Sequence, residues 1–187
     1  MGWILLFLVF GVIFLIIAVR NNIVRHHNAT IRAWSDVASF ERQKVKILDD
    51  LEPLVSRYSQ FEKGTLEKVT ELRQQIMKLN LNDTDISQLQ HIEALNKELI
   101  QNLNVVVENY PELKADQIYL TMMNEIEEQN ENVGAAITIF NRNVELFNNY
   151  IQVFPNNLIN SATLGKKAIR PFRDNTQHNF NYRPNFY

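Results

Sequence analysis

Residues 3–19, WILLFLVFGVIFLIIAV, decide how this chain is built, because they form an apolar run without a charged side chain. With Gly2 the run is about eighteen residues long, and a helix rising ~1.5 Å per residue would extend it over roughly 27 Å. That length crosses the hydrocarbon layer of a bilayer, where a helix satisfies its own backbone polar groups. The run predicts a single-pass membrane anchor over residues 1–19.

A cleavable signal peptide is the alternative interpretation of the same segment. Signal peptides carry Lys or Arg before the apolar run and a small-residue cleavage site after it. Here no basic residue precedes the run, and VRNN follows it at 19–22, so an uncleaved anchor is favoured. Arg20, Arg25 and Arg32 come next, with no acid before Asp36. Because positive flanks stay in the cytoplasm, the N-terminus is predicted outside and the remainder of the chain cytoplasmic.

The composition of the remaining chain narrows the class of protein. About 165 residues follow the anchor, the size of one ordinary domain. The net charge is −2, which gives no reason to expect nucleic acid or a strongly charged small-molecule substrate. The chain has no cysteine, so disulfides, thiolate metal sites and cysteine nucleophiles are excluded. Only five glycines and five prolines occur, which is compatible with long uninterrupted helices.

Residues 20–60 continue the anchor as a first helical arm. Apolar side chains recur at steps of three, four or seven, and Glu41 interrupts their stripe. Pro53 predicts a kink near 49–53, since proline removes one helical hydrogen bond. The Gly64-Thr65 pair is predicted to end the arm, with Thr65 capping the next helix.

Residues 65–109 form a middle arm that is interrupted by NLNDTD at 80–85, a run of residues that favour turns and caps. Either Thr84 or Asp85 can cap the helix that follows. Tyr110-Pro111 is predicted to end this arm, because a residue before proline is pushed out of the helical region.

Residues 115–154 form the most regular arm. Its apolar residues follow a 4-3-4-3 spacing, which is the seam of left-handed helix packing: Val133, Ile137, Phe140, Val144, Phe147, Ile151 and Phe154. Trp34, Phe140, Phe147 and Phe154 are expected in the core. Asn130 stands between apolar positions of the seam, either as a tolerated, locally bonded residue or as a buried residue that fixes the register.

The arm lengths predict the architecture. Arms one and three would each extend ~60 Å and the middle arm ~65 Å, so short turns would give an antiparallel up-down bundle over residues 20–155. The fold class is therefore all-α, with three long arms, one interrupted, or about four helices. In this arrangement the turn at 109–114 lies near the bilayer, and residues 60–65 and Pro155 lie at the far end.

Residues 156–187 are basic and aromatic, without a helical or alternating period. Either a partly disordered tail or a docking segment fits this composition. Cations and rings suit anionic lipid or a partner surface, and the predicted anchor favours these over nucleic acid. The basic interaction candidates are Lys166, Lys167, Arg170 and Arg173.

A catalytic or metal site finds no support in the sequence. None of the four histidines follows a glutamate by three residues, as a carboxylate-bridged metal bundle requires. The acidic groups at 49–52 and 125–131 are best interpreted as solvated helix faces. A low-ranked alternative uses them around a metal as an accessory subunit. No catalytic residue, cofactor or small-molecule substrate is predicted.

Four segments resemble conserved motifs of the LemA family, in the family's order. They are AWSDV at 33–37, TLEKV at 65–69 with Arg73, ENYPELKA at 108–115, and FNRNVELFNNYIQVFPNNL at 140–158. The residues that carry this structural motif are Trp34, Asn109, Tyr110, Pro111, Phe140, Asn141, Phe147, Asn148, Phe154 and Pro155.

The resemblance implies a bacterial inner-membrane protein with a single membrane span, a long antiparallel helical domain and no established enzymatic activity. It also implies a role in membrane or envelope organisation. The chain departs from the family where Ile137 and Ile139 replace arginines, which widens the apolar stripe of the last arm. We therefore expect a scaffold that contacts a second copy or other membrane-associated proteins, with Ile137 and Ile139 as interaction candidates. The alternative is an adaptor that senses lipid or a partner through its basic tail.

Overall fold

The computed structural model describes residues 2–58 and 63–173, and in these residues the chain is helical, with no strand. Helix α1 (Gly2–Tyr58) is a single 57-residue helix that continues through Pro53 without a break. Pro53 and Asp49, whose carbonyl loses its helical partner, are both exposed. Water can therefore hydrate that carbonyl, which explains why the helix continues.

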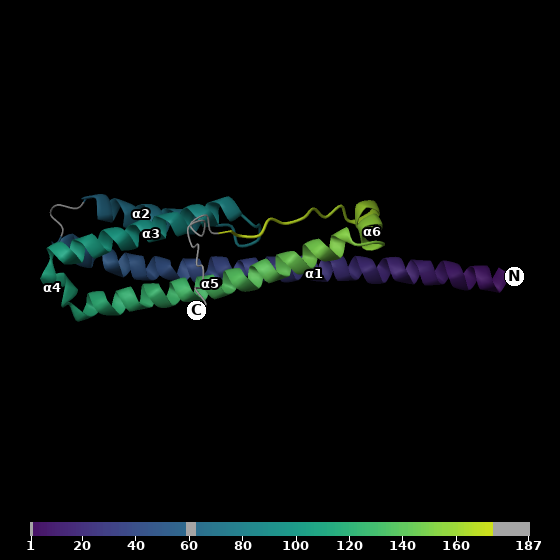
Figure 1. The fold of residues 1–187 in the computed structure, drawn as a ribbon, viewed down its shortest axis with the longest axis horizontal. Helices are drawn as coiled ribbons and strands as arrows, with labels where there is room; N and C mark the ends of the chain where they lie inside the picture. The colour runs from purple at the N-terminus through teal and green to yellow at the C-terminus, as the bar shows by residue number, and fades with distance from the viewer. Residues whose placement is uncertain (1, 59–62, 174–187) are drawn as a thin grey trace, which may run out of the picture.

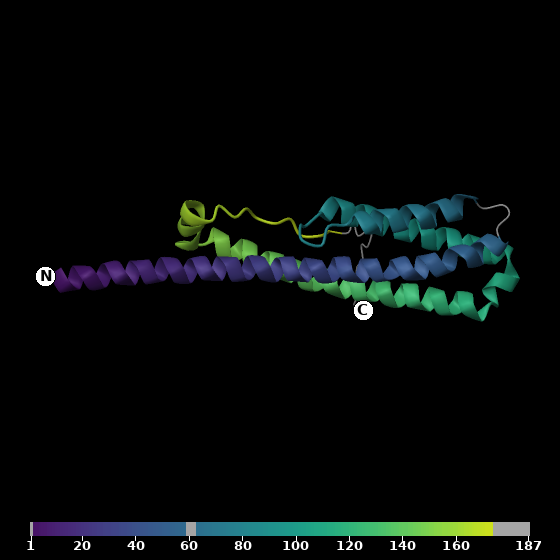
Figure 2. The ribbon, with the colours of Figure 1, turned by 180° about the vertical axis from the view of Figure 1, so that it is seen from behind.

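Helix α5 (Gln117–Gln152) lies antiparallel along α1, and these two helices form the length of a rod (Figure 1). Helices α2 (Lys63–Lys78) and α3 (Ile86–Asn109) form a shorter hairpin over the end of the rod that is remote from the N-terminus. Figure 2 shows the same arrangement from behind. The short helix α4 (Pro111–Lys114) links α3 to α5, and α6 (Asn156–Thr163) packs beside α1 at the opposite end.

The register between α1 and α5 repeats every seven residues. The ring of His27 meets that of Phe147 at a centroid distance of 5.4 Å, and seven residues further along α1 the ring of Trp34 meets that of Phe140, also at 5.4 Å. Between them, the Thr30 hydroxyl donates to the Asn143 carbonyl across 3.2 Å. The heptad seam therefore positions residues 140–147 of α5 against residues 27–34 of α1.

The predicted position of the 109–114 turn is wrong. The segment at 80–85 reverses the chain completely instead of interrupting one arm, so α3 returns to the end from which α2 started (Figure 1). Side chains of α1 hold this reversal. The Trp34 indole N–H donates to the Asn80 carbonyl across 2.7 Å, and the Ser35 hydroxyl donates to the Leu81 carbonyl, also across 2.7 Å. The 109–114 turn consequently lies remote from the apolar segment, whereas Pro155 lies close to that segment (Figure 1).

Two of the predicted caps can be compared with the helix ends. Asp85 caps α3, and its carboxylate accepts from the Gln88 backbone N–H at 2.9 Å, as predicted. Helix α2 already begins at Lys63, so Thr65 lies buried inside its first turn and does not cap it. Part of the predicted turn at 60–65 lies outside the described residues.

The helices that contribute to the core differ between the two halves of the rod. In the remote half, buried side chains of α1, α2, α3 and α5 form one four-helix core around Trp34, Leu72, Leu99 and Phe140. Near the apolar segment a smaller cluster remains, made of Val19, Ile23, Phe147 and Ile151. There α6 and residues 164–173 occupy the side that the α2–α3 hairpin leaves uncovered (Figure 1).

The N-terminal part of α1 projects beyond this core. Among the described residues, α1 is the one helix that is long and apolar enough to cross a membrane. Its apolar side chains are uncovered, with Trp3 78% and Phe7 75% exposed. The domain covers this segment only at its end, where Val19 is buried.

Candidate functional site

Residues 164–173, the C-terminal strap, follow α6 and run antiparallel along α5, held by two asparagines of that helix. The Asn148 side chain accepts from the Ile169 backbone N–H at 2.9 Å and donates to the Ile169 carbonyl at 2.8 Å. The Asn141 side chain makes the same pair of bonds with Phe172, at 2.8 and 2.9 Å. Each amide thus satisfies both backbone groups of one strap residue. Because the two asparagines are seven residues apart, they lie on one face of α5.

Two further amides hold the ends of the C-terminal strap. Asn160 of α6 accepts from the Lys166 N–H at 3.1 Å and donates to the Lys166 carbonyl at 2.8 Å. Gln90 of α3 donates to the Arg173 carbonyl at 2.8 Å. The Phe172 ring is buried with the core. Amide pairing replaces the periodic hydrophobicity that would have made this segment predictable, and residues 174–187 lie outside the described residues.

The predicted interaction residues are divided between the core and the surface. Ile137 packs against the core, whereas Ile139 is 56% exposed. The Lys166 ammonium lies 3.4 Å from Nε2 of His27. The pKa of His27 is lowered mainly by burial and to a smaller extent by this positive charge. Lys167, Arg170 and Arg173 are exposed along the C-terminal strap.

The motif residues are divided among the turn after α3, the core and the contacts to the C-terminal strap. Asn109 ends α3, Tyr110 caps it with an N–H donated to the Val106 carbonyl, and Pro111 opens α4. The expectation that Phe154 is a core residue is wrong, because its side chain is 78% exposed. Helix α5 ends at Gln152, so the helical spacing that buries earlier members of the seam no longer applies to Phe154.

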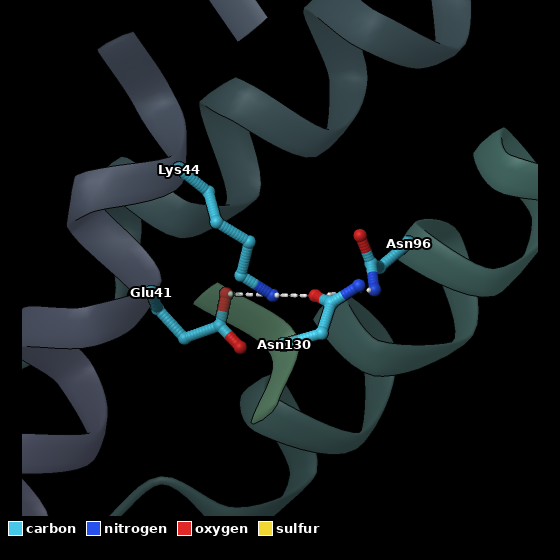
Figure 3. Close-up of polar contacts among 4 residues, drawn as sticks. All are labelled: Glu41, Lys44, Asn96 and Asn130. Atoms are coloured by element: carbon cyan, nitrogen blue, oxygen red, sulfur yellow. Dashed lines mark hydrogen bonds and ion pairs between the residues drawn. The ribbon is translucent and has the colours of Figure 1, made fainter. Parts of the chain in front are cut away.

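A buried polar cluster crosses the four-helix half of the rod (Figure 3). Glu41 and Lys44, both from α1, are 0% and 1% exposed, and Glu41 Oε2 lies 3.1 Å from Lys44 Nζ. The Lys44 ammonium donates to Asn130 Oδ1 of α5 at 2.9 Å, and the same oxygen accepts from Asn96 of α3 at 3.0 Å. Asn130 therefore bonds to two other helices, which favours the register interpretation over a locally bonded residue.

The electrostatics of this cluster make Glu41 a weak acid. Burial raises its pKa from the ordinary 4.5 to about 7; Lys44 opposes the rise, and the neighbouring Glu93 adds to it. The sequence signalled this site only as a polar break in the apolar stripe of the first arm. The cluster can fix how α1, α3 and α5 pair, and it can take up one proton.

The acidic groups do not assemble into a metal centre in the described ranges. No set of three or more histidine or acidic side chains there could hold an ion. Asp49 and Glu52 pair with Arg73 of α2, Glu52 at 3.3 Å. The acidic run at 49–52 is therefore partly a structural link between α1 and α2.

Comparison with known proteins identifies the family of this chain. A family model described as the LemA family matches residues 33–181, which is most of the chain. The chain belongs to the LemA family. A relative named Protein LemA, from Metamycoplasma hominis, is 28% identical over 147 residues. The matched region is 78% of this chain and 65% of the relative, so this chain spans about two thirds of that protein's length.

LemA membership places both polar contact sets within the matched region. Asn141 and Asn148 are the two asparagines of the repeated Phe-Asn pairs at 140–141 and 147–148, and their function in the fold is to hold the C-terminal strap. In each pair the phenylalanine is buried and the next residue bonds the strap. The LemA family is not a known enzyme family.

Proposed function

We propose that this LemA-family chain is a membrane-tethered, non-catalytic rod that assembles side by side with further copies of itself through α5. The observation that carries the proposal is an exposed apolar stripe on that helix. Ile139 and Leu146 are 56% and 47% exposed and stand seven residues apart on α5. A seven-residue apolar repeat on a helix that is already packed on its other side is typical of a second helix contact.

A second copy is the partner that fits the geometry best. Anchoring through residues 3–19 would hold all copies in one orientation, so their stripes would run parallel at the same height above the bilayer. Arg142 and Glu145 lie exposed between Ile139 and Leu146, so charges of both signs flank the stripe. Tethering also raises the effective concentration, which compensates for a short stripe.

Single cysteines test this assembly, because the chain has none of its own. Leu146→Cys should form a disulfide-linked dimer in the membrane on mild oxidation. Val105→Cys is the matched control, since Val105 is 51% exposed but belongs to α3, and it should stay monomeric. Leu146→Glu should reduce the size of the particle extracted with its surrounding lipid. Monomeric particles of the unmodified chain would refute self-association. Equal crosslinking at positions 146 and 105 would refute the assignment of the contact to α5.

A further inference from the structure

We infer that the corner between α5 and α6, residues 153–158, is a second membrane contact that inserts into the lipid interface beside the anchor. The corner combines three exposed apolar side chains in one place. Val153, Phe154 and Leu158 are 52%, 78% and 60% exposed. The inference rests on the anchoring proposed above and adds to it a lipid-binding surface on the folded domain.

The helix register places this corner at the level of the bilayer surface. His27 contacts Phe147, and Trp34 contacts Phe140, so each step of seven on α1 matches a step of seven on α5. The same register sets Gln152, the last residue of α5, level with Asn22, so the corner begins close to Arg20, the first charged residue after the apolar run. Val19 packs with Ile151 in the small cluster and confirms that the domain reaches the end of that run.

Helix α6 buries two polar side chains and exposes a large apolar one. Its two buried side chains are polar, Asn156 at 8% and Asn160 at 7% exposed, whereas Leu158 between them is 60% exposed. Asn156 donates to the Tyr150 carbonyl at 3.0 Å, and Asn160 bonds the Lys166 backbone, so the amides are satisfied inside. The exposed face of α6 is mixed, with Leu158 beside Asn157 and Ser161, so Leu158 is the side chain of α6 that can enter the lipid interface.

The charge distribution supports the same occupant. Neither residues 1–35 nor residues 146–173 contain an acid. These two segments hold seven basic residues, namely Arg20, Arg25, Arg32, Lys166, Lys167, Arg170 and Arg173. Of these, Arg20, Arg25 and Lys167 are exposed at the end of the rod that carries the corner. Basic side chains around an apolar wedge bind the anionic phosphates of lipid headgroups while the wedge enters the acyl boundary.

Site-specific labelling of the full chain tests the contact. The chain would be reconstituted into phosphatidylcholine–phosphatidylglycerol vesicles, with an environment-sensitive fluorophore on one cysteine at a time. Phe154→Cys and Leu158→Cys report on the corner. Ile118→Cys is the matched control, because Ile118 is 56% exposed at the opposite end of α5. Leu8→Cys reports separately on the anchor itself.

We expect lipids that carry a shallow spin label to quench the probe at 154 and 158 severalfold more than the probe at 118, and aqueous iodide to show the reverse order. Equal quenching at 154 and 118 with strong quenching at 8 would overturn the inference and leave the anchor intact. Absence of lipid quenching at 8 would overturn the anchoring as well. Protection of 154 from iodide without lipid quenching would assign the corner to a protein partner, against the inference.

Discussion

The buried carboxyl group of Glu41 makes the stability of this protein dependent on pH in an unusual direction. Its pKa in the folded chain is about 7, against 4.5 when unfolded, because burial disfavours the charged form. Between these two values the folded chain binds more protons than the unfolded chain. The stabilising effect is therefore fully present below pH 4.5 and is lost as the pH rises through about 7.

The size of the effect follows from the difference between the two pKa values. At 1.36 kcal/mol per unit, the rise from 4.5 to about 7 corresponds to about 3 kcal/mol of unfolding free energy. The side chain is 0% exposed, so solvent screening does not reduce this value much. Replacing the neighbouring carboxylate, as in Glu93→Gln, should lower the pKa of Glu41 and make the loss smaller.

The assay compares the full chain with Glu41→Gln by urea unfolding in detergent. Far-UV circular dichroism monitors the unfolding at a series of pH values from below 4.5 to above 7. Glutamine resembles the protonated acid, so the difference between the two unfolding free energies should change by about 3 kcal/mol across this range. His27, with a lowered pKa, contributes with the opposite sign, but it contributes equally to both proteins and cancels in the difference. Parallel curves for the two proteins would refute the reasoning.

Three further predictions concern single side chains. Asn148→Ala removes two hydrogen bonds to the C-terminal strap. Amide exchange in the strap should accelerate by the factor that corresponds to a loss of about 1–3 kcal/mol in local stability. Asn149→Ala, at an exposed position, should leave the exchange rate unchanged. Equal exchange in both variants would contradict the assigned contact. Phe140→Ala should lower the unfolding free energy in urea by about 3–5 kcal/mol, because the ring is fully buried, and a loss below that of an exposed residue would show that the ring is not in the core. Trp34→Phe leaves the Asn80 carbonyl without its donor and should cost about 1–3 kcal/mol in the same titration, with faster amide exchange in the 79–85 loop; unaltered exchange in this loop would argue against the bond.

The sequence predicted the elements that depend on local periodicity. The heptad spacing of the last arm identified Phe140 and Phe147 as buried, and both are 0% exposed. Thr84 and Asp85 were both recognisable as candidate caps because they precede an apolar helix, and Asp85 is the residue that caps it. The C-terminal strap escaped prediction, since its binding depends on Asn141 and Asn148, whose side chains pair with backbone groups that no sequence pattern marks.

The buried cluster was only partly predictable for a related reason. Glu41 stood out as a charge in an apolar stripe, but the side chains that surround it come from three helices. Lysine is usually found at the protein surface, yet Lys44 is buried. Its ammonium group bonds to Asn130, which is distant in the sequence. Pairings of this kind depend on the tertiary arrangement, and that arrangement was the part of the prediction that failed.

The failure concerns six residues, 80–85, whose turn-forming composition fits an interruption and a reversal equally well. Arm lengths alone could not separate the two, because a hairpin and a straight arm contain the same number of residues. The hydrogen bonds from Trp34 and Ser35 of α1 to this segment fit only the reversal. The consequence reaches the far end of the chain. With a straight middle arm Phe154 would stand ~60 Å from the apolar run. The reversal instead brings the end of α5 back to the end of that run, where Val19 packs with Ile151, as the lipid contact that we propose for Phe154 requires.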